Sequence, residues 1–333
     1  MLRGAVFGFG NMGRQFTRFL NASADLGARI VVAVNRGPAG CEAARSEFGL
    51  EATASVDEAL DLGLDFVIVS STTAAHAAQV IAAAARGCPV FCEKPIALNL
   101  ADADRMISAV RAAGVISVVN YIMRFNPGYR RIKEMVDGGE LGEVLSVCHQ
   151  KTRGYGLHAG GARHRAVIEP EESGGWAVHH ACHDLDFLHW TLGGIESVYG
   201  LTRSTAPGGR SEEVVEALLR FTCGAIGSIA DSVSILRQHY TRVIGSRGSI
   251  LLTGENQESL FLFQREGCPE RVARPEAIDV RDEKNPGGGL RHFLECIRSG
   301  TESPHDLAAA RPSLAAALAL QESARCGLPV HPA

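Results

Sequence analysis

Near its N-terminus the chain reads Arg3-Gly-Ala-Val-Phe-Gly8-Phe-Gly-Asn-Met-Gly13, an apolar run followed by three glycines at fixed spacing. Gly8 permits a tight turn, Gly10 lets the backbone approach a pyrophosphate, and Gly13 lets a helix pack closely on the strand. The free N–H groups at the start of that helix favour a phosphate. The segment therefore predicts a dinucleotide-binding domain in which the cofactor contacts Gly8, Phe9, Gly10, Asn11, Met12 and Gly13.

The first third of the chain alternates short apolar runs with alanine-rich helical patterns. Strands without a polar face are buried on both sides, and their alternation with helices predicts a parallel, doubly wound sheet. The predicted strands are Gly4–Phe7, Arg29–Val34, Asp65–Val69, Pro89–Cys92 and Val115–Asn120, and the helices include Ala74–Arg86 and Ala101–Ala113.

The pattern changes near Tyr121. From Glu143 onward strands follow one another with turns between them, which predicts a large, mostly antiparallel open sheet. A helical segment at Gly175–Leu192 interrupts this series, and two helices follow it. We therefore expect an α/β protein with a Rossmann domain at residues 1–122 and an α+β domain for substrate binding and oligomerisation at residues 123–333.

Bulk properties indicate a globular protein without a strong overall electrostatic field. The chain has 333 residues, 46% of them hydrophobic, and a formal net charge of −4, which argues against nucleic-acid or membrane partners. Its nine cysteines include no Cys-x-x-Cys pair, so we expect reduced thiols and a cytoplasmic protein. No secretory signal and no apolar run of about 18 residues is evident.

The second predicted strand is followed by Asn35-Arg36. NAD-selective sites usually carry an acid here that holds the ribose 2′-OH, whereas an arginine can pair with a 2′-phosphate. This favours NADP slightly over NAD, although Arg36 could equally stack on the adenine without selecting either cofactor.

Glu93-Lys94-Pro95 directly follows the Pro89–Cys92 strand. Functional residues in such sheets lie beyond the carboxyl ends of the strands. A lysine beside a positively charged nicotinamide could have a lowered pKa and act on a substrate hydroxyl. A solvated surface lysine is the competing interpretation.

In the helical segment after Gly174, His179 and His183 are four residues apart and share a helix face. Three interpretations remain: a zinc site, which lacks an obvious third ligand; a general acid/base in a pocket; and satisfied core histidines. We favour the second and expect no metal. The preceding loop, Lys151–Arg165, carries basic and aromatic residues among glycines, and either covers an anionic or polyhydroxylated substrate or is merely solvated.

Taken together, these motifs resemble the glucose–fructose oxidoreductase / inositol dehydrogenase (Gfo/Idh/MocA) family. The resemblance rests on the glycine motif, on Glu93-Lys94-Pro95 and on His183-Asp-Leu-Asp186. Further matches are Ser71-Thr-Thr-Ala-Ala-His76, Arg124-Phe-Asn-Pro127, Phe293 and the C-terminal helix, so that it covers essentially the whole chain.

The resemblance implies a Rossmann domain joined to an open-sheet domain, assembled as a homodimer or homotetramer, with a Lys94–Pro95 peptide that is often cis. It implies that Ser71, Thr72, His76 and Glu93 line the cofactor together with Asn35, Arg36 and Lys94, that Lys94 hydrogen-bonds the reacting oxygen, and that His183 is the general acid/base. One departure is His179, which stands where the family commonly has Asp; it either replaces that Asp as a relay or changes the electrostatics of the site. We expect substrate contacts from Arg124, Tyr155, Arg165, Trp176 and His180.

The leading hypothesis is hydride transfer between NAD or NADP and a secondary alcohol or ketone of a sugar, inositol or glycoside. A second hypothesis is redox-neutral glycoside hydrolysis through transient oxidation and elimination. A third is a non-catalytic dinucleotide sensor, against which Lys94 and His183 both argue.

Overall fold

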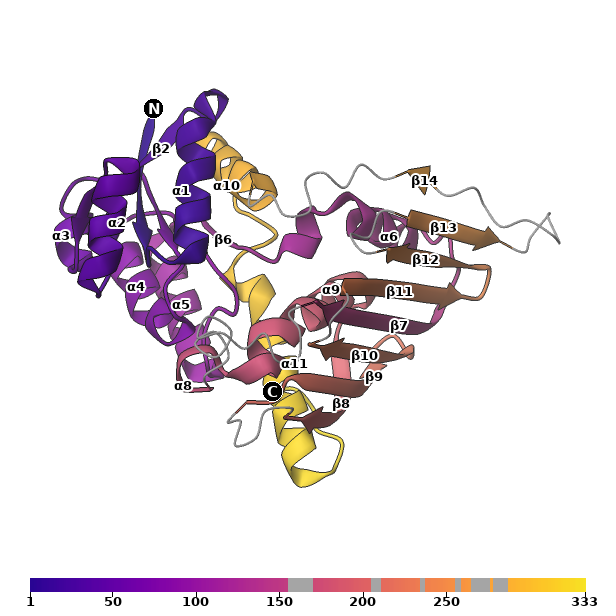
Figure 1. Cartoon of the computed structure of the whole chain (residues 1–333). Helices are drawn as coiled ribbons and strands as arrows, with labels where there is room; N and C mark the ends of the chain where they lie inside the picture. The colour runs from indigo at the N-terminus through magenta and orange to yellow at the C-terminus, as the bar shows by residue number, and fades with distance from the viewer. Residues whose placement is uncertain (155–169, 205–210, 234–236, 255–258, 265–275, 278–286) are drawn as a thin grey trace. The chain divides into compact units, whose positions relative to one another are not determined.

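The computed structural model describes residues 1–154, 170–204, 211–233, 237–254, 259–264, 276–277 and 287–333 (Figure 1). The chain forms two compact units. The first comprises Met1–Tyr121 and Asn285–Arg311, and the second comprises Ile122–Lys284 and Pro312–Ala333.

The first unit contains a six-stranded sheet in which every neighbouring pair is parallel, in the order β3-β2-β1-β4-β5-β6. This is the doubly wound order of a Rossmann domain, and it confirms the predicted fold class. The order reverses between β1 and β4, which is where such sheets bind their ligands. The strands are β1 (Leu2–Phe7), β2 (Ala28–Val34), β3 (Glu51–Thr53), β4 (Phe66–Val69), β5 (Val90–Cys92) and β6 (Ser117–Val119).

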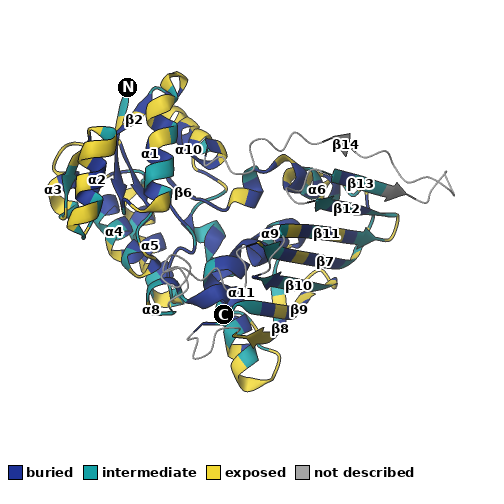
Figure 2. Cartoon of the chain, viewed as in Figure 1, coloured by how far each residue is buried: buried dark blue, intermediate teal, exposed yellow. Residues whose placement is uncertain are grey.

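Helices cover this sheet, and their ends follow the expected capping chemistry. Asn99 accepts a hydrogen bond from the Asp102 N–H at the start of α5, and Gly114 ends that helix in the left-handed conformation. The strands are buried, whereas the helices expose their outer faces (Figure 2). The elements are α1 (Asn11–Ala22), η1 (Ala24–Leu26), α2 (Pro38–Phe48), α3 (Val56–Leu60), α4 (Thr73–Ala85) and α5 (Leu100–Ala113).

The helix α10 (Gly287–Ser299) also belongs to the first unit. Its Phe293 is fully buried, with ring centroids 6.0 Å from Phe66 and 5.7 Å from Phe91. The sequence predicts one uninterrupted second domain after residue 122. The chain instead returns to the first unit because Phe293 buries its ring against residues of β4 and β5.

The second unit contains an eight-stranded open sheet in the order β14-β13-β12-β11-β7-β10-β9-β8. Only the β10–β7 pair among these is parallel, so the predicted mostly antiparallel sheet is confirmed. The strands are β7 (Val144–Arg153), β8 (Ile195–Arg203), β9 (Val214–Phe221), β10 (Ile226–Ser232), β11 (Arg237–Gly245), β12 (Gly248–Gly254), β13 (Ser259–Gln264) and β14 (Glu276–Ala277).

The predicted helix at Gly175–Leu192 is two elements in the structure: a π-helical turn, η3 (Ala177–Ala181), which leads directly into α9 (Cys182–Leu192). Single π-turns within helices occur frequently at functional sites. The remaining helices are η2 (Ile122–Phe125), α6 (Pro127–Asp137), α8 (Pro170–Ser173) and α11 (Leu307–Cys326).

A buried ion pair fixes α9. Arg124 donates from Nε to Asp186 Oδ2 at 2.9 Å and from Nη2 to Asp186 Oδ1 at 2.7 Å. Ser313 Oγ adds a third hydrogen bond to Asp186 at 2.8 Å. Both charged side chains are almost completely buried, so each depends on the other for compensation.

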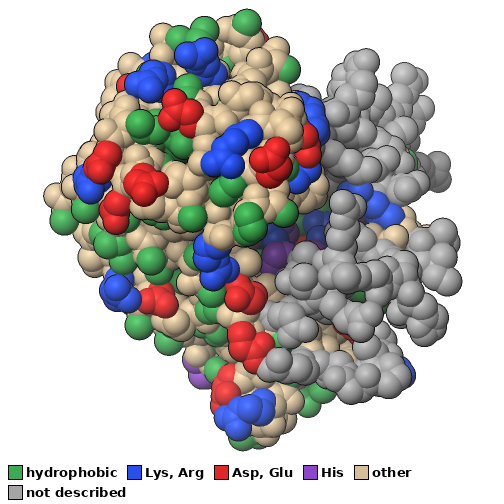
Figure 3. All heavy atoms as spheres, turned by 60° about the vertical axis from the view of Figure 1, so that its left-hand side comes forward, with side chains coloured by type: hydrophobic (Ala, Val, Ile, Leu, Met, Phe, Trp, Pro, Cys, Tyr) green, Lys and Arg blue, Asp and Glu red, His purple; other side chains and the backbone are tan. Residues whose placement is uncertain are grey.

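One face of the molecule carries charges of both signs. On the face of the molecule in Figure 3, basic and acidic side chains are interspersed among polar and apolar ones. Among the described residues, no helix is long and apolar enough to cross a membrane.

Replacing Arg124 with Met should destabilise the protein by about 3–5 kcal/mol, because it leaves the Asp186 carboxylate buried without its counter-charge. Urea denaturation monitored by circular dichroism measures the change in the free energy of unfolding. The matched control is Arg131→Met, since Arg131 forms a half-exposed pair with Glu140 at 3.3 Å and should cost less than about 1 kcal/mol. Equal losses in the two variants would contradict the importance of the buried pair.

Candidate functional site

The glycine loop after β1 has the geometry that a dinucleotide requires. Gly8 has φ +93°, and a Cβ there would lie 2.4 Å from the backbone N of Ser71. A Cβ on Gly13 would lie 2.1 Å from the carbonyl oxygen of Gly8, which confirms close packing of α1 on the turn. Gly10 is exposed and has nothing within 4 Å of the Cβ position, so its backbone is open to a ligand. The residues present therefore fit the pyrophosphate of a dinucleotide.

The start of α1 adds to this fit. Its N-cap is Gly10, no side chain caps it, and its first turn, which begins with Asn11 and Met12, contains no acidic residue. N–H groups at such a helix end favour an anion.

Other predicted cofactor residues around this loop support it from behind. Asn35 Oδ1 accepts from the Phe9 N–H at 3.2 Å, and Asn35 Nδ2 donates to the Gly37 carbonyl at 2.9 Å. Phe9 is buried edge-on against Phe48, with centroids 5.4 Å apart. Arg36 is exposed at the end of β2. Asn35 and Phe9 therefore fix the shape of the loop, while Arg36 is the accessible member of the group.

His76 links the ends of β4 and β5. Its Nδ1 lies 3.0 Å from the Pro95 carbonyl oxygen and its Nε2 lies 3.2 Å from the Ser71 carbonyl oxygen. Burial lowers the pKa of His76 to about 4, so the ring is neutral at physiological pH. Ser71 Oγ donates to Gln79 Oε1 at 2.7 Å, and Thr72 is exposed at the N-cap of α4. The buried His76 ring thus bridges the backbone of Ser71, which follows β4, and that of Pro95, which follows β5.

Glu93 orients the segment that carries Lys94. Its Oε1 accepts from Asn120 Nδ2 at 2.7 Å and its Oε2 accepts from the Lys94 N–H at 3.1 Å. Burial raises the pKa of Glu93, while Lys94 and the Asn120 hydrogen bond oppose that rise. The Lys94–Pro95 peptide is cis, as the family resemblance implies. Lys94 itself is partly exposed at the carboxyl end of β5.

In the second unit, the candidate catalytic histidines occupy the η3–α9 junction. His179 and His180 lie in the π-turn, and His183 is the second residue of α9. The rings of Trp176 and His180 lie 4.2 Å apart, and those of His179 and His180 lie 4.8 Å apart, edge to face. The junction therefore packs its aromatic rings closely, and His183 is buried beside them.

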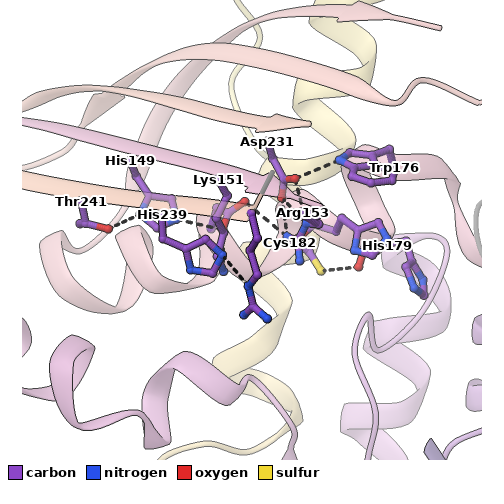
Figure 4. A network of polar contacts seen from close by, with 12 residues as sticks. His149, Lys151, Arg153, Trp176, His179, Cys182, Asp231, His239 and Thr241 are labelled. Atoms are coloured by element: carbon purple, nitrogen blue, oxygen red, sulfur yellow. Dashed lines mark hydrogen bonds and ion pairs between the residues drawn. The ribbon is translucent and has the colours of Figure 1, made fainter. Parts of the chain in front are cut away.

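Beneath this junction lies a buried polar network that joins α9 to the sheet (Figure 4). Asp184 Oδ1 lies 2.9 Å from His149 Nε2 and 3.5 Å from Lys151 Nζ. His149 Nδ1 lies 2.7 Å from Thr241 Oγ1. Burial opposes ionisation of Asp184, yet Lys151 and His149 together hold its pKa well below the usual range.

A second buried carboxylate, Asp231, completes the network. It accepts from Arg153 Nε at 2.9 Å and from Trp176 Nε1 at 3.1 Å, and Arg153 Nη2 donates to the His180 carbonyl at 3.2 Å. Burial raises the pKa of Asp231 to about 7; Arg153 opposes the rise, and the charge of Asp184 adds to it. Asp231 and Arg153 therefore hold the π-turn to β7 and β10 through both side chain and backbone.

The structure gives two of the predicted substrate contacts another role. Arg124 is committed to Asp186, and Trp176 is fully buried with its indole N–H on Asp231. His180 is buried against Trp176. Tyr155 and Arg165 lie outside the described residues. Burial and pairing therefore make Arg124 and Trp176 part of the packing that holds the η3–α9 junction in place.

Sequence reasoning missed the residues that form this support. The motifs give no role to Asn120, His149 and Asp231, they include Asp184 only as the residue after His183, and they place Lys151 only in a basic loop. One available signal is His149-x-Lys151-x-Arg153, in which polar residues alternate along the covered face of β7. Within the described ranges, no group of three or more His, Cys, Asp or Glu side chains could hold a metal ion.

Comparisons with known proteins match both units. The model of the oxidoreductase family with an NAD-binding Rossmann fold covers residues 2–121, and that of the GFO/IDH/MocA C-terminal domain covers residues 129–251. The chain is 28% identical to scyllo-inositol 2-dehydrogenase (NAD(+)) of Bacillus subtilis, over 99% of this chain and 96% of that protein. It is 31% identical to 2,7-anhydro-N-acetylneuraminate hydratase of Escherichia coli, over 86% of this chain and 76% of that protein.

Solved structures show the same fold. The WlbA dehydrogenase from Bordetella pertussis, in complex with NADH and UDP-GlcNAcA, superposes with a TM-score of 0.86 at 24% identity, covering 99% of this chain and 97% of that one. Levoglucosan dehydrogenase in complex with NADH gives a TM-score of 0.88 at 19% identity, covering 100% and 99%. With both units matched in order, the chain belongs to the Gfo/Idh/MocA family of oxidoreductases, whose first domain is an NAD-binding Rossmann fold.

Proposed function

We propose that this protein is an NAD(P)-dependent dehydrogenase or reductase that transfers hydride between nicotinamide and a secondary alcohol or ketone of a sugar, inositol or glycoside. The observation that carries the proposal is the position of Lys94. It follows β5 in a sheet whose glycine loop fits a dinucleotide, and Glu93 and Asn120 hold its backbone in place. Relatives named as inositol dehydrogenases support the substrate class.

The bound nicotinamide supplies a hydride acceptor when the substrate is oxidised. From the family resemblance we infer that His183 is the general acid/base that takes the hydroxyl proton, and that Lys94 hydrogen-bonds the reacting oxygen. His179 replaces the Asp that the family commonly has at its position. Since a histidine, when neutral, provides no fixed negative charge, we infer that His179 either replaces that Asp as a relay or changes the electrostatics of the site.

Cofactor choice depends on the end of β2. No acid follows Val34, and Arg36 is exposed there. Because a guanidinium pairs with a 2′-phosphate, we infer that the protein accepts NADP as well as NAD.

A second candidate function is a redox-neutral reaction, in which the sugar is oxidised transiently, eliminates a group and is reduced again. The 31% identity to the anhydro-sialic acid hydratase and the histidine at position 179 favour it. A dehydrogenase accumulates reduced nicotinamide in step with its product, whereas the redox-neutral enzyme needs only catalytic cofactor and gives no net absorbance change.

We also propose that the protein is a cytoplasmic homodimer or homotetramer. Leu201, Leu218 and Ile226 expose 58%, 61% and 55% of their surface. The pairing of β8, β9 and β10 puts them on one side of the open sheet, opposite the buried face. An apolar patch of this kind is typical of an interface. The cysteines of the described residues are free, as expected in a reducing compartment.

Replacing Lys94 with Met should lower kcat by about 10²–10⁴-fold, because the reacting oxygen loses its hydrogen-bond donor. NADH binding, followed by fluorescence titration, should remain within about threefold, since the glycine loop is intact. Turnover is measured at 340 nm with inositols and sugars. Lys133→Met is the control, because Lys133 pairs with Asp137 in the second unit. Unchanged turnover in Lys94→Met would contradict a part for Lys94 in the reaction, whereas NADH binding with no turnover in the unaltered protein would favour the sensor hypothesis.

Replacing Arg36 with Glu should shift the preference toward NAD. A carboxylate repels the 2′-phosphate of NADP and accepts from the 2′-OH of NAD, so the ratio of kcat/KM for NADP to that for NAD should fall at least about tenfold. Arg29→Glu, an exposed change within β2, the strand that precedes Arg36, serves as the control. A ratio that stays constant would show that Arg36 has no part in selection.

A further inference from the structure

One end of the covered face of the second sheet concentrates positive charge. Lys151 and Arg153 point from β7 to the same side as Arg237 and His239 on the neighbouring strand β11. In the register of these strands, Arg237 stands opposite Arg153, and His239 stands opposite Lys151. Like charges at opposed positions destabilise a sheet unless an anion compensates them.

The two carboxylates at this end are already engaged. Asp231 is held by Arg153, and Asp184 is held by His149 and Lys151. Lys151 lies in the register between Asp231 and His239 (Figure 4). Burial lowers the pKa of Lys151, so a further anion would stabilise its ammonium form. Arg237 pairs with no carboxylate among the described residues, and its Nε donates to His239 Nε2 at 3.4 Å.

His239 adds a donor without an acceptor. Burial, with the charges of Lys151 and Arg237, lowers the pKa of His239 to about 2, so the ring is neutral. Because Nε2 accepts from Arg237, the single proton lies on Nδ1. That atom is buried and has no hydrogen-bond partner in the part of the chain that the structure describes, and His239 is only 5% exposed. Buried donors are normally satisfied, which indicates a missing acceptor here.

The position of these groups relates them to the candidate catalytic helix. Asp184, which contacts Lys151, directly follows His183, and Arg153 donates to the His180 carbonyl. The charged end of the sheet therefore lies beneath the η3–α9 junction. A ligand bound beside His183 could therefore direct a negative group, on the end that points away from His183, toward the N–H donors of Lys151, Arg237 and His239.

We propose that Arg237, Lys151 and His239 bind a carboxylate of the substrate, so that the substrate class is sugar acids rather than neutral sugars. This inference rests on the proposed function, because it places the substrate beside His183. The fork of Arg237 suits a carboxylate, which accepts two parallel N–H bonds. A phosphate offers the same oxygens with more charge, and the test separates the two.

The test measures binding to matched probes by calorimetry in the presence of NADH. D-glucuronate is compared with D-glucose, and D-galacturonate with D-galactose; D-glucose 6-phosphate is the phosphate probe. The uronates should bind at least about tenfold more tightly than their neutral partners. Arg237→Gln should weaken uronate binding by about ten- to a hundredfold and leave neutral sugars within about twofold. Arg237→Lys, which keeps the charge and loses the fork, should lie between.

Arg242→Gln is the control for these variants, because Arg242 lies on the exposed face of the same strand; it should leave uronate binding unchanged. Three results would overturn the proposal: no preference for the uronates, equal weakening of charged and neutral probes in Arg237→Gln, or tighter binding of the phosphate. Reduction of NAD or NADP by neutral sugars, together with uronate binding that Arg237→Gln does not weaken, would refute the carboxylate site and retain the dehydrogenase. Tight uronate binding with no reduction of NAD or NADP would support the carboxylate site and contradict the dehydrogenase function.

Discussion

The second unit depends on the compensation of charges that its helix buries against its sheet. Asp184 and Asp231 are fully buried, and each finds its counter-charge on β7, in Lys151 and Arg153. An uncompensated charge at this depth is very costly, so α9 is held where Asp184 meets Lys151 and His149. The same constraint fixes the direction of the η3–α9 junction, and with it the places of His179 and His183.

The first unit meets a corresponding requirement with backbone geometry. Its glycine loop can form because Gly8 and Gly13 have no Cβ; a Cβ at either position would clash with the backbone of Ser71 or Gly8. Lys94 is then oriented by Glu93, a buried carboxylate that is stabilised by Asn120. In both units buried polar neighbours hold the segment that carries the candidate reactive group, which is partly exposed for Lys94 and buried for His183. This arrangement keeps a site in place without restricting what binds to it.

Much of the fold follows from the sequence because its determinants are local. The glycine spacing after β1 and the apolar runs of β1, β2, β4, β5 and β6 predict the Rossmann sheet, although not its edge strand β3, and successive turns predict the antiparallel one. The return of α10 to the first unit does not follow, since Phe293 contacts rings more than two hundred positions away in the chain. The π-turn likewise does not follow, because Ala177–Ala181 lies within one continuous helical pattern of the sequence.

The candidate site likewise follows from the sequence only in part. Lys94 and His183 are evident from motifs, but their supports are not, because His149 and Asp184 are 35 positions apart and Arg153 and Asp231 are 78 apart. The sequence predicts Arg124 as a substrate contact. In the structure Arg124 neutralises Asp186, a partner visible only once α9 is folded against η2.

The most direct test of the account follows a deuterium atom on the reacting carbon of a substrate. Myo-inositol or a hexuronate, deuterated at each carbinol carbon, is incubated with the protein and stoichiometric NAD or NADP. Net hydride transfer predicts one deuterium on C4 of the reduced nicotinamide for each molecule of ketone formed. A product that forms without accumulation of labelled nicotinamide, or deuterium released into water, would contradict it.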